Sequence, residues 1–449
     1  MTAPTGPVSP TRAVVPAPRL NQLISRRPEL SPLVLLRRKA PEAQIYHTQA
    51  LVRQALVSAP DSVRAGATVA IGVGSRGIAG IADIVRACVD DVRARGGVPF
   101  IFPAMGSHGG ATADGQESVL AHLGVTHASV GAPIRADMAT VEVGTANGVT
   151  IAVDAQAASA DHVLLINRLK SHTSFSGQVE SGLAKMLAVG MGKQRGAEEL
   201  HRRGPAHLEG RIADAGRVIK AKLPIWGGLA IVETAHKSLH SVQFLSAEQI
   251  GNDEEAQLLL VAKAHEARLP FSHLDVLVVD LMGKDISGTG MDTNVLGRRM
   301  VRGMPEPTNI DITNVVVLRV SRASHGNATG IGLADFMSAR TLEDVDVIAT
   351  YANALTAGLQ GVQRAQLPVV LATDRDAVHA ALLTSGVQEL AQIRLARIRS
   401  TVHLDEIQVT ANLVDEAGQD FTAVTEGASP AQSSFDEDGT LRAWPRSMA

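Results

Sequence analysis

The chain of 449 residues is about three times as long as a typical domain of about 150 residues, and its 45% hydrophobic content supplies an ample core. Its formal net charge is only −3, with 42 basic and 45 acidic side chains, so we expect neither a nucleic-acid partner nor a membrane-surface partner. The single Cys88 excludes an intrachain disulfide and a thiolate zinc or iron–sulfur site built from this chain alone. We therefore expect a cytoplasmic protein that acts on a small molecule.

Proline content and apolar patterning divide the chain into four predicted segments. The first 32 residues hold seven of the 20 prolines, which predicts a disordered, proline-rich leader over residues 1–40. Two α/β domains with mainly parallel sheets are predicted over 45–215 and 220–424, with their boundary near 205–225 and an active-site cleft between them. Residues 425–449 have no apolar period and are predicted to be a tail.

In the first domain, apolar runs alternate with glycine-rich loops. Strands are predicted at 69–73, 98–105 and 163–166, and a hairpin at 141–143 with 149–153. Helices are predicted over 78–95, from 114 to about 124, and over 179–189. Strand–loop–helix units of this kind are typical of parallel sheets, and ligands of such sheets bind beyond the carboxyl ends of the strands.

In the second domain, the same pattern predicts strands at 229–232, 274–279 and 315–320. Helices are predicted over 253–267, 338–359 and 374–385. This arrangement again favours an α/β fold.

Three candidate functional side chains follow predicted strands. His108 and His172 each lie in a loop directly after an apolar strand, where a side chain can reach a ligand from a rigid scaffold. Arg76 follows the strand at 69–73 and is flanked by small residues, so its guanidinium could bind a carboxylate or phosphate with two hydrogen bonds. The alternative interpretations are solvated or core imidazoles and an ordinary surface ion pair.

Lysine is rare in this chain, with nine lysines against 33 arginines, so a lysine in a tight loop is a candidate for chemistry. Lys185 lies among Leu183, Ala184, Met186 and Leu187, whose apolar side chains would desolvate its amine and favour the nucleophilic, neutral form. For Lys170, Lys193 and Lys284, which also lie near glycines or loop histidines, ordinary surface lysines are the competing interpretation. His201 follows Lys185 by sixteen residues.

Six segments together resemble the lactate racemase family, in particular its broad, largely uncharacterised branch. The resemblance runs from about residue 45 to 340 and is carried by Gly74–Gly77, Met105–Thr112, Asn167–Thr173, Ser181–Leu187, Gly283–Arg298 and Gly326–Gly332. It implies a nickel-pincer nucleotide, which is a pyridinium mononucleotide joined to a lysine through a thioamide, with nickel held by the ring carbon, two sulfurs and a histidine.

The resemblance also implies a role for each candidate residue. Lys185 would be the attachment point, His201 the nickel ligand, and His108 and His172 the paired acid/base residues. Arg76 would hold the substrate carboxylate, and Lys284 would contact the substrate from the second domain. The implied activity is racemisation or epimerisation of a small 2-hydroxy acid, by removal and return of hydride at Cα.

The residue types fit this chemistry, but other functions stay open. The Cα–H of a 2-hydroxy acid is a weak acid, so inversion is easier if hydride leaves while a base takes the hydroxyl proton. The planar intermediate needs a second base on its other face. The alternatives are a racemase or epimerase, or a hydro-lyase, on the same fold that uses Mg²⁺ or another divalent cation, and a non-catalytic organic-acid binding protein. A homodimer is a candidate assembly.

Overall fold

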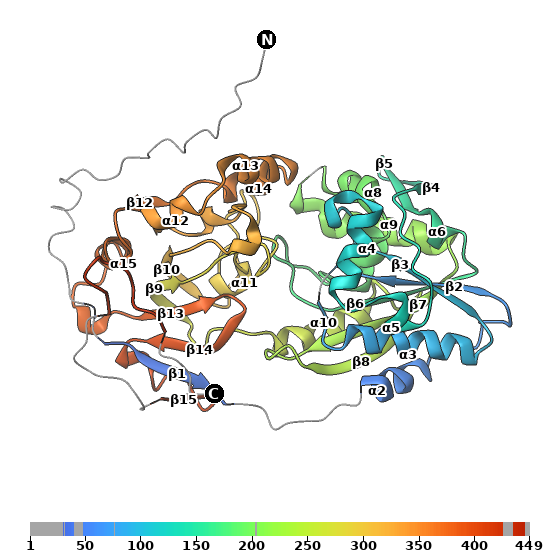
Figure 1. The fold of residues 1–449 in the computed structure, drawn as a ribbon, viewed down its shortest axis with the longest axis horizontal. Coiled ribbons are helices and arrows are strands. Elements are labelled where there is room, and N and C mark those ends of the chain that lie inside the picture. Colours follow the sequence, from blue (N-terminus) through green and yellow to red (C-terminus); the bar gives the residue numbers. More distant parts are fainter. Residues whose placement is uncertain are drawn as a thin grey trace, which may run out of the picture. The chain divides into compact units, whose positions relative to one another are not determined.

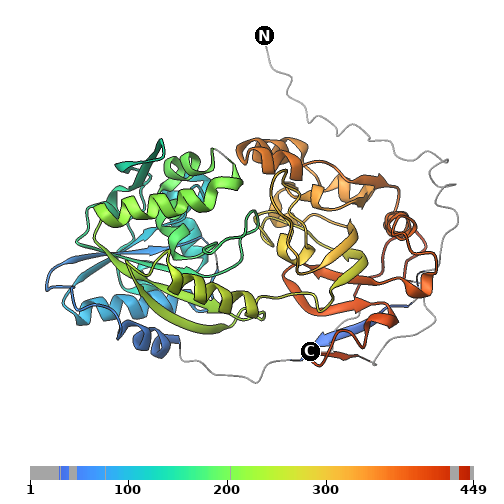
Figure 2. The same ribbon diagram turned by 180° about the vertical axis from the view of Figure 1, so that it is seen from behind.

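The computed structural model describes residues 30, 32–39, 48–75, 77–202, 204–424 and 434–444. They form two compact units. The N-terminal unit contains Pro41–Arg268 and Arg302–Pro305, and the C-terminal unit contains Leu269–Val301 and Glu306–Ala449 together with strand β1 (Val34–Arg38). Figures 1 and 2 show the elements of each unit from opposite sides. Each unit has a mainly parallel sheet with helices beside it, which confirms the predicted α/β class.

The N-terminal sheet has the strand order β3-β2-β6-β7-β8, in which the first four strands are parallel and β8 is antiparallel. The strands are β2 (Thr68–Val73), β3 (Val98–Pro103), β6 (His162–Arg168), β7 (Ile225–Glu233) and β8 (Leu239–Ser246). The chain goes from β2 to β3 on one side and later returns to β6 on the other side of β2. Ligands of open α/β sheets bind at such a reversal, beyond the carboxyl ends of the strands.

Alternating side chains of β2 enter two different apolar cores. Val69, Ile71 and Val73 contact one core, which α2 (Thr48–Leu56) and α3 (Ile81–Ala94) cover. Ala70 enters the other core, which receives apolar residues of α9 (Leu208–Lys222) and α10 (Asp253–His265). Figure 1 shows α2 and α3 on one side of the sheet and α9 on the other. The sheet is therefore buried on both faces, as expected for parallel strands.

The predicted hairpin is present as β4 (Thr140–Ala146) and β5 (Val149–Asp154). α8 (Lys193–His201) packs on β5, and α9 packs on β4. The remaining helices of this unit include α4 (Ala113–His122), α5 (His127–Val130), α6 (Ala155–Ala158) and α7 (Leu183–Lys185). The hairpin is therefore joined to the rest of the unit by α8, which ends at His201, and by α9.

The C-terminal sheet has the order β12-β11-β10-β9-β13-β14-β1-β15. The strands from β12 to β13 are parallel, and β14, β1 and β15 are antiparallel to their neighbours. The strands are β9 (His273–Val279), β10 (Asp311–Val317), β11 (Phe336–Ser338), β12 (Val369–Leu371), β13 (Leu395–Ser400), β14 (His403–Val409) and β15 (Phe421–Ala423). The helices are α11 (Thr293–Leu296), α12 (Ala339–Glu343), α13 (Val347–Thr356), α14 (Leu359–Arg364) and α15 (Asp374–Leu383).

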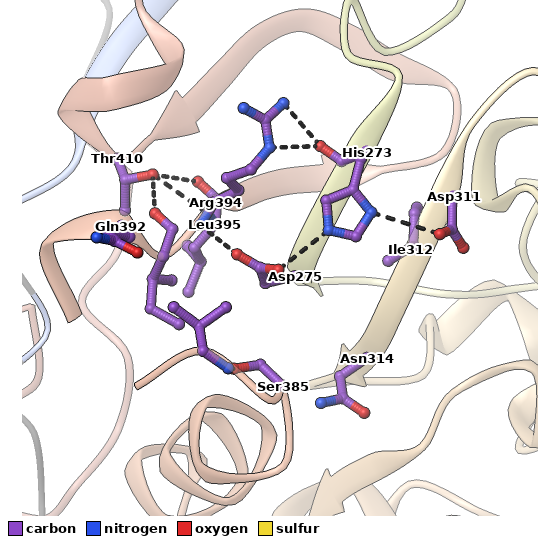
Figure 3. A network of polar contacts seen from close by, with 12 residues as sticks. His273, Asp275, Asp311, Ile312, Asn314, Ser385, Gln392, Arg394, Leu395 and Thr410 are labelled. Carbon is purple, nitrogen blue, oxygen red and sulfur yellow. Dashed lines mark hydrogen bonds and ion pairs between the residues drawn. The ribbon is translucent and has the colours of Figure 1, made fainter. Parts of the chain in front are cut away.

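A polar network joins the amino-terminal ends of β9, β10 and β13 (Figure 3). The His273 ring lies 3.0 Å from Asp275 Oδ1 and 3.5 Å from Asp311 Oδ2. The guanidinium of Arg394 donates to the His273 carbonyl oxygen at 3.0 and 3.1 Å. Since this network lies opposite the carboxyl ends, it stabilises the sheet away from the edge where ligands of such folds bind.

The predicted domain boundary near 205–225, with domains over 45–215 and 220–424, is wrong. β7 pairs with β6 in parallel, so α9 is the crossover helix of the N-terminal sheet, and the chain changes units at Arg268.

The leader predicted over 1–40 contains β1, which pairs with β14 and β15; residues 1–29 lie outside the described part. Within the predicted tail, Phe435 and Leu441 are buried and form a bridge, and 425–433 and 445–449 lie outside the described part.

Two predicted helices are also different in the structure. The span 338–359 is divided into the end of β11, α12 and α13, because the Asp346 side chain accepts from the Ala349 amide and begins a new helix there. The span 179–189 contains only the short α7 and part of a π-helical turn, Met186–Gly190. Apolar periodicity alone predicted continuous helices in both places.

Candidate active site

Three loops of the N-terminal unit meet at one edge of its sheet. Val73, the last residue of β2, pairs with Pro103 at the end of β3 and with Ile166 near the end of β6. Because the three strands are parallel, the loops that follow them begin side by side. The predicted placement of His108 and His172 in strand-end loops is confirmed. Arg76, in the loop after β2, lies outside the described residues.

The segment that carries Lys185 is tied to these loops by hydrogen bonds. Lys170 and Ser181 exchange two backbone hydrogen bonds of 2.9 and 3.1 Å, and the Asn167 side chain donates to the Gly182 carbonyl at 2.7 Å. On the other side, the Gly106 amide donates to the Gly190 carbonyl at 3.0 Å. Lys185 therefore lies between attachments to the loop after β6 and the loop after β3.

Lys185 and His201 belong to one irregular helical segment. Lys185 ends α7, the π-helical turn Met186–Gly190 follows, and α8 begins at Lys193 and ends at His201. His201 is thus the last residue of a helix. π-helical turns are rare and are frequent at functional sites, so the turn directly after Lys185 supports a functional role for this segment.

The surroundings of His201 keep its imidazole neutral. Burial is the main cause of its lowered pKa, and the charges of Lys185 and Arg211 lower it further, against the Ala197 carbonyl, which raises it. His201 Nδ1 lies 2.6 Å from that carbonyl oxygen, so Nδ1 carries the proton and Nε2 has the lone pair. The imidazole therefore has the form that binds a metal.

His108 and His172 have opposite ring tautomers in their neutral forms. His108 Nδ1 lies 2.7 Å from the Met105 carbonyl oxygen and therefore donates to it, which leaves the lone pair on Nε2. His172 Nδ1 accepts from the Ser174 amide at 3.0 Å, so its proton is on Nε2. One ring thus presents a basic Nε2, and the other presents an Nε2–H hydrogen-bond donor.

The two rings also differ in exposure. His108 is exposed at the sheet edge, whereas His172 is only 9% exposed and lies 4.3 Å from the Phe175 ring, measured between centroids. The His172 ring is therefore held by packing as well as by its loop, while the exposed His108 ring depends on the loop that carries it.

Sequence reasoning missed several buried residues that hold these loops, among them Gln116, Asp154 and Glu180. It treated Lys193 as an ordinary surface lysine in one of two interpretations, but this side chain is fully buried. The rarity of lysine was the only signal for it, since nothing in the local pattern predicts burial of an amine.

Lys284 belongs to the C-terminal unit and follows β9. Its ammonium donates to the Gly288 carbonyl at 2.8 Å, and its backbone amide donates to Ser324 Oγ at 2.7 Å. A contact between Lys284 and a substrate therefore stays a prediction.

Across the ranges that the structure describes, no group of three or more His, Cys, Asp or Glu side chains is arranged to hold a metal ion. Within the same ranges, no helix is long and apolar enough to cross a membrane.

Comparisons with known proteins give a family match over part of the chain. A model described as a domain of unknown function (DUF362) matches residues 75–246, a span that contains His108, His172, Lys185 and His201. No curated protein matches the chain.

Two solved structures are similar to the chain at low identity. A Thermotoga maritima protein, solved by a structural genomics consortium, is 12% identical, with a TM-score of 0.46 over 80% of this chain and 96% of its own. The lactate racemase apoprotein from Thermoanaerobacterium thermosaccharolyticum is 11% identical, with a TM-score of 0.42 over 64% of this chain and 73% of its own. These likenesses concern the fold, and the function of this chain is inferred from its site.

Proposed function

We propose that this protein is a racemase or epimerase of a small 2-hydroxy acid. The observation that carries the proposal is the strand order β3-β2-β6, in which the strands that lead to His108 and His172 flank β2 on both sides. Strands separated by one other strand lie about 10 Å apart, which leaves room for a small acid between two imidazoles. A substrate above the end of β2 would then have one histidine on each side.

The two rings supply a proton acceptor and a hydrogen-bond donor for inversion. The basic Nε2 of His108 takes the hydroxyl proton when the substrate is oxidised at Cα. The Nε2–H of His172 donates to the carbonyl oxygen of the planar 2-oxo acid when Cα is reduced from its other face, and full proton transfer to that oxygen uses the imidazolium form of His172, because a neutral imidazole would become an imidazolate. In the reverse direction the two histidines exchange roles, so a complete racemase needs both.

Arg76 is the proposed partner of the substrate carboxylate. It follows β2, the strand between the two histidine strands, so its loop begins where the substrate would lie. A guanidinium binds a carboxylate with two parallel hydrogen bonds, which would fix the acid and present its two faces to the two histidines.

The surroundings of Lys185 and His201 fit a lysine-linked nickel-pincer nucleotide. Lys185 would hold the pyridinium ring through its amine, and the neutral His201 would supply the imidazole ligand for nickel. When bound, this cofactor accepts the hydride of the substrate Cα and returns it. The positive charge of Arg211 near His201 also favours an anionic ligand such as a phosphate-bearing nucleotide.

The proposal is tested by racemisation assays on a panel of small 2-hydroxy acids, with protein coexpressed with cofactor-making enzymes. His108→Ala and His172→Ala should each lose activity by about 100-fold or more, because each direction uses both residues. His122→Ala is the matched control, since His122 is an exposed histidine of α4 and lies outside the site. Unchanged activity of both site variants would contradict the two-base mechanism.

A second experiment tests the cofactor. Lys185→Arg should keep the fold and the charge but lose the adduct mass on the peptide that contains residue 185, because a guanidinium does not deprotonate to react. Lys222→Arg, at the exposed end of α9, is the control and should keep both adduct and activity. If the protein is active without an adduct and incorporates solvent deuterium at Cα, the hydride-transfer mechanism is wrong. Proton exchange assisted by a divalent cation would then be the better hypothesis.

A further inference from the structure

Each of the two histidine loops rests on its own ion pair, and in each pair the carboxylate is excluded from solvent. We propose that Lys193, Asp154 and Gln116 form a positioning network for His108, and that Glu180 and Lys263 form a separate one for His172. The catalytic role of these networks rests on the proposed function, in which the two histidines act on opposite faces of one substrate. The contacts that form the networks are present in the protein without substrate.

The first network begins with an ion pair that is wholly excluded from solvent. Lys193 Nζ lies 2.9 Å from Asp154 Oδ2, and both side chains are 0% exposed. The same ammonium donates to the Pro103 carbonyl oxygen at 2.7 Å and to Gln116 Oε1 at 3.0 Å. The ammonium is therefore held by one ion pair and two hydrogen bonds.

Gln116 connects this ion pair to the loop that carries His108. Its Nε2 donates to the Gly106 carbonyl at 2.8 Å and to the His108 carbonyl at 3.3 Å. Lys193 fixes the amide orientation of Gln116, because Oε1 must face the ammonium and Nε2 must then face the loop. The network therefore acts on His108 through its backbone carbonyl.

The backbone of Lys193 indicates that this arrangement is costly to build. Its φ is +52°, a left-handed conformation that is uncommon for residues with a Cβ. Glycine would adopt it without strain, but glycine has no ammonium to reach Asp154, Pro103 and Gln116. Strained residues of this kind are retained where the surrounding structure over-determines them, commonly at functional sites.

The second network holds the backbone of the His172 loop through a buried carboxylate. Glu180, whose side chain is 1% exposed, accepts from the His172 amide through Oε2 at 2.6 Å. Its Oε1 accepts from the Gly177 amide at 3.2 Å and from Lys263 Nζ at 2.6 Å. Beside it, Glu266 Oε1 accepts from the Ser171 amide at 2.6 Å, so the C-terminal end of α10 supports this loop twice.

The two networks share no residue, and this separation makes the proposal testable. Buried ion pairs are weak evidence for stability as such, because burial of the charges costs about as much as their attraction returns. In both networks, however, the buried charge leads to the backbone of a histidine loop. We therefore expect each network to fix the ring state of its own histidine and to leave the other unchanged.

The experiment uses the full chain labelled with ¹⁵N-histidine, without cofactor or substrate, near pH 8, where ordinary imidazoles are neutral. Two-bond ¹H–¹⁵N spectra report which ring nitrogen carries the proton, and His108→Asn and His172→Asn assign the two signals. Gln116→Leu should convert His108 from a fixed Nδ1–H tautomer to an averaged signal and leave His172 unchanged.

Glu180→Gln should change the His172 signal and leave the His108 signal unchanged. A glutamine presents an NH₂ group at one of the two acceptor positions, so either the His172 amide or the Lys263 ammonium would face another donor. His172 should then lose its fixed Nε2–H signal while His108 keeps its own. In activity assays each variant should lower kcat at least about tenfold with little change in KM, since misplaced catalytic groups affect the reaction more than binding.

Unchanged signals of both histidines in both variants, or loss of both signals in each variant, would overturn the proposal. If Gln116→Leu does not fold, Asp154→Asn takes its place, because its Oδ1 still accepts from the Ala157 amide while the charge that pairs with Lys193 is lost. The ring signals need no substrate. Selective loss of signals in a protein without racemase activity would therefore overturn only the proposed function.

Discussion

The His108 loop and the His172 loop are built in opposite ways. The His108 ring is exposed, and beneath its loop lies an ion pair with no exposure at all, Lys193 with Asp154. The His172 ring is buried against Phe175, and the cation of its ion pair, Lys263, is 25% exposed. The exposed His108 ring obtains its orientation from the rigid base under its loop, whereas the buried His172 ring is oriented by packing against Phe175 in addition to the support of its loop.

The two loops also differ in their connection to the proposed cofactor site. α8 begins with Lys193, which supports the His108 loop, and ends with His201, the proposed metal ligand. The support of the His172 loop comes from α10, a helix without any proposed cofactor ligand. Changes in α8 are therefore expected to affect both one base and the cofactor, and changes in α10 only the other base.

The largest expected effect is on stability after Lys193→Met. This change leaves Asp154 buried without its cation, and removal of one partner of a buried pair costs about 3–5 kcal/mol. Lys263→Met is the matched comparison and should cost about 2 kcal/mol, because Glu180 keeps its two backbone amide donors. Urea unfolding measures both free energies.

The cost of Lys193→Met should also depend on pH. Burial raises the pKa of Asp154, and Lys193 opposes this effect, so the carboxyl should bind a proton more readily once the lysine is gone. A folded-state pKa above the unfolded value gives stability that is lost as pH rises, so the variant should be least stable at high pH. Equal losses of unfolding free energy in Lys193→Met and Lys263→Met would contradict the proposed difference in burial between the two ion pairs.

A smaller effect is expected from two neighbouring glycines of the His108 loop. Gly109 and Gly110 have φ values of +67° and +65°, so an alanine at either position costs about 1–2 kcal/mol. A Cβ on Gly109 would also lie 2.5 Å from the Gly115 carbonyl carbon, while a Cβ on Gly110 meets nothing within 4 Å.

Gly109→Ala should therefore lower the free energy of unfolding by about a further 1–3 kcal/mol and displace the helix that carries Gln116. Gly110→Ala should lower it only by the cost of the backbone strain. Thermal unfolding and the His108 ring signal test the pair. Equal effects of the two substitutions would show that the loop is not held tightly against α4.

The smallest expected effect concerns pH and His201. Its folded-state pKa is lowered, mainly by burial, so the unfolded chain binds more protons as pH falls through the ordinary histidine range near 6.5. Stability should therefore decrease as pH falls through this range, and His201→Gln should remove that part of the decrease. Urea unfolding at several pH values from about 7.5 to 5.5 measures this decrease; parallel curves for parent and variant would contradict a half-buried, neutral His201.

Much of the candidate site could be predicted from local patterns. Apolar runs ended by glycine-rich polar loops located β2, β3 and β6, and with them the positions of His108 and His172 at strand ends. The pairing of Lys185 with His201 was implied by the resemblance to the lactate racemase family, and the charge of Lys185 is one of the lesser causes of the lowered pKa of His201. These features are readable because strand periodicity and loop composition are local properties of the chain.

Other features depended on contacts between residues far apart in the sequence. The domain boundary moved to Arg268 because β7 pairs with β6, and strand pairing is not encoded in the composition of either strand. The burial of Lys193 is decided by Asp154, Pro103 and Gln116, which come from three other elements. The ring tautomers are likewise decided by which backbone groups the folded loops bring to each imidazole. The sequence by itself determined where the functional side chains leave the sheet, while the tertiary structure decided how they are held, because burial and hydrogen bonding are properties of the assembled fold.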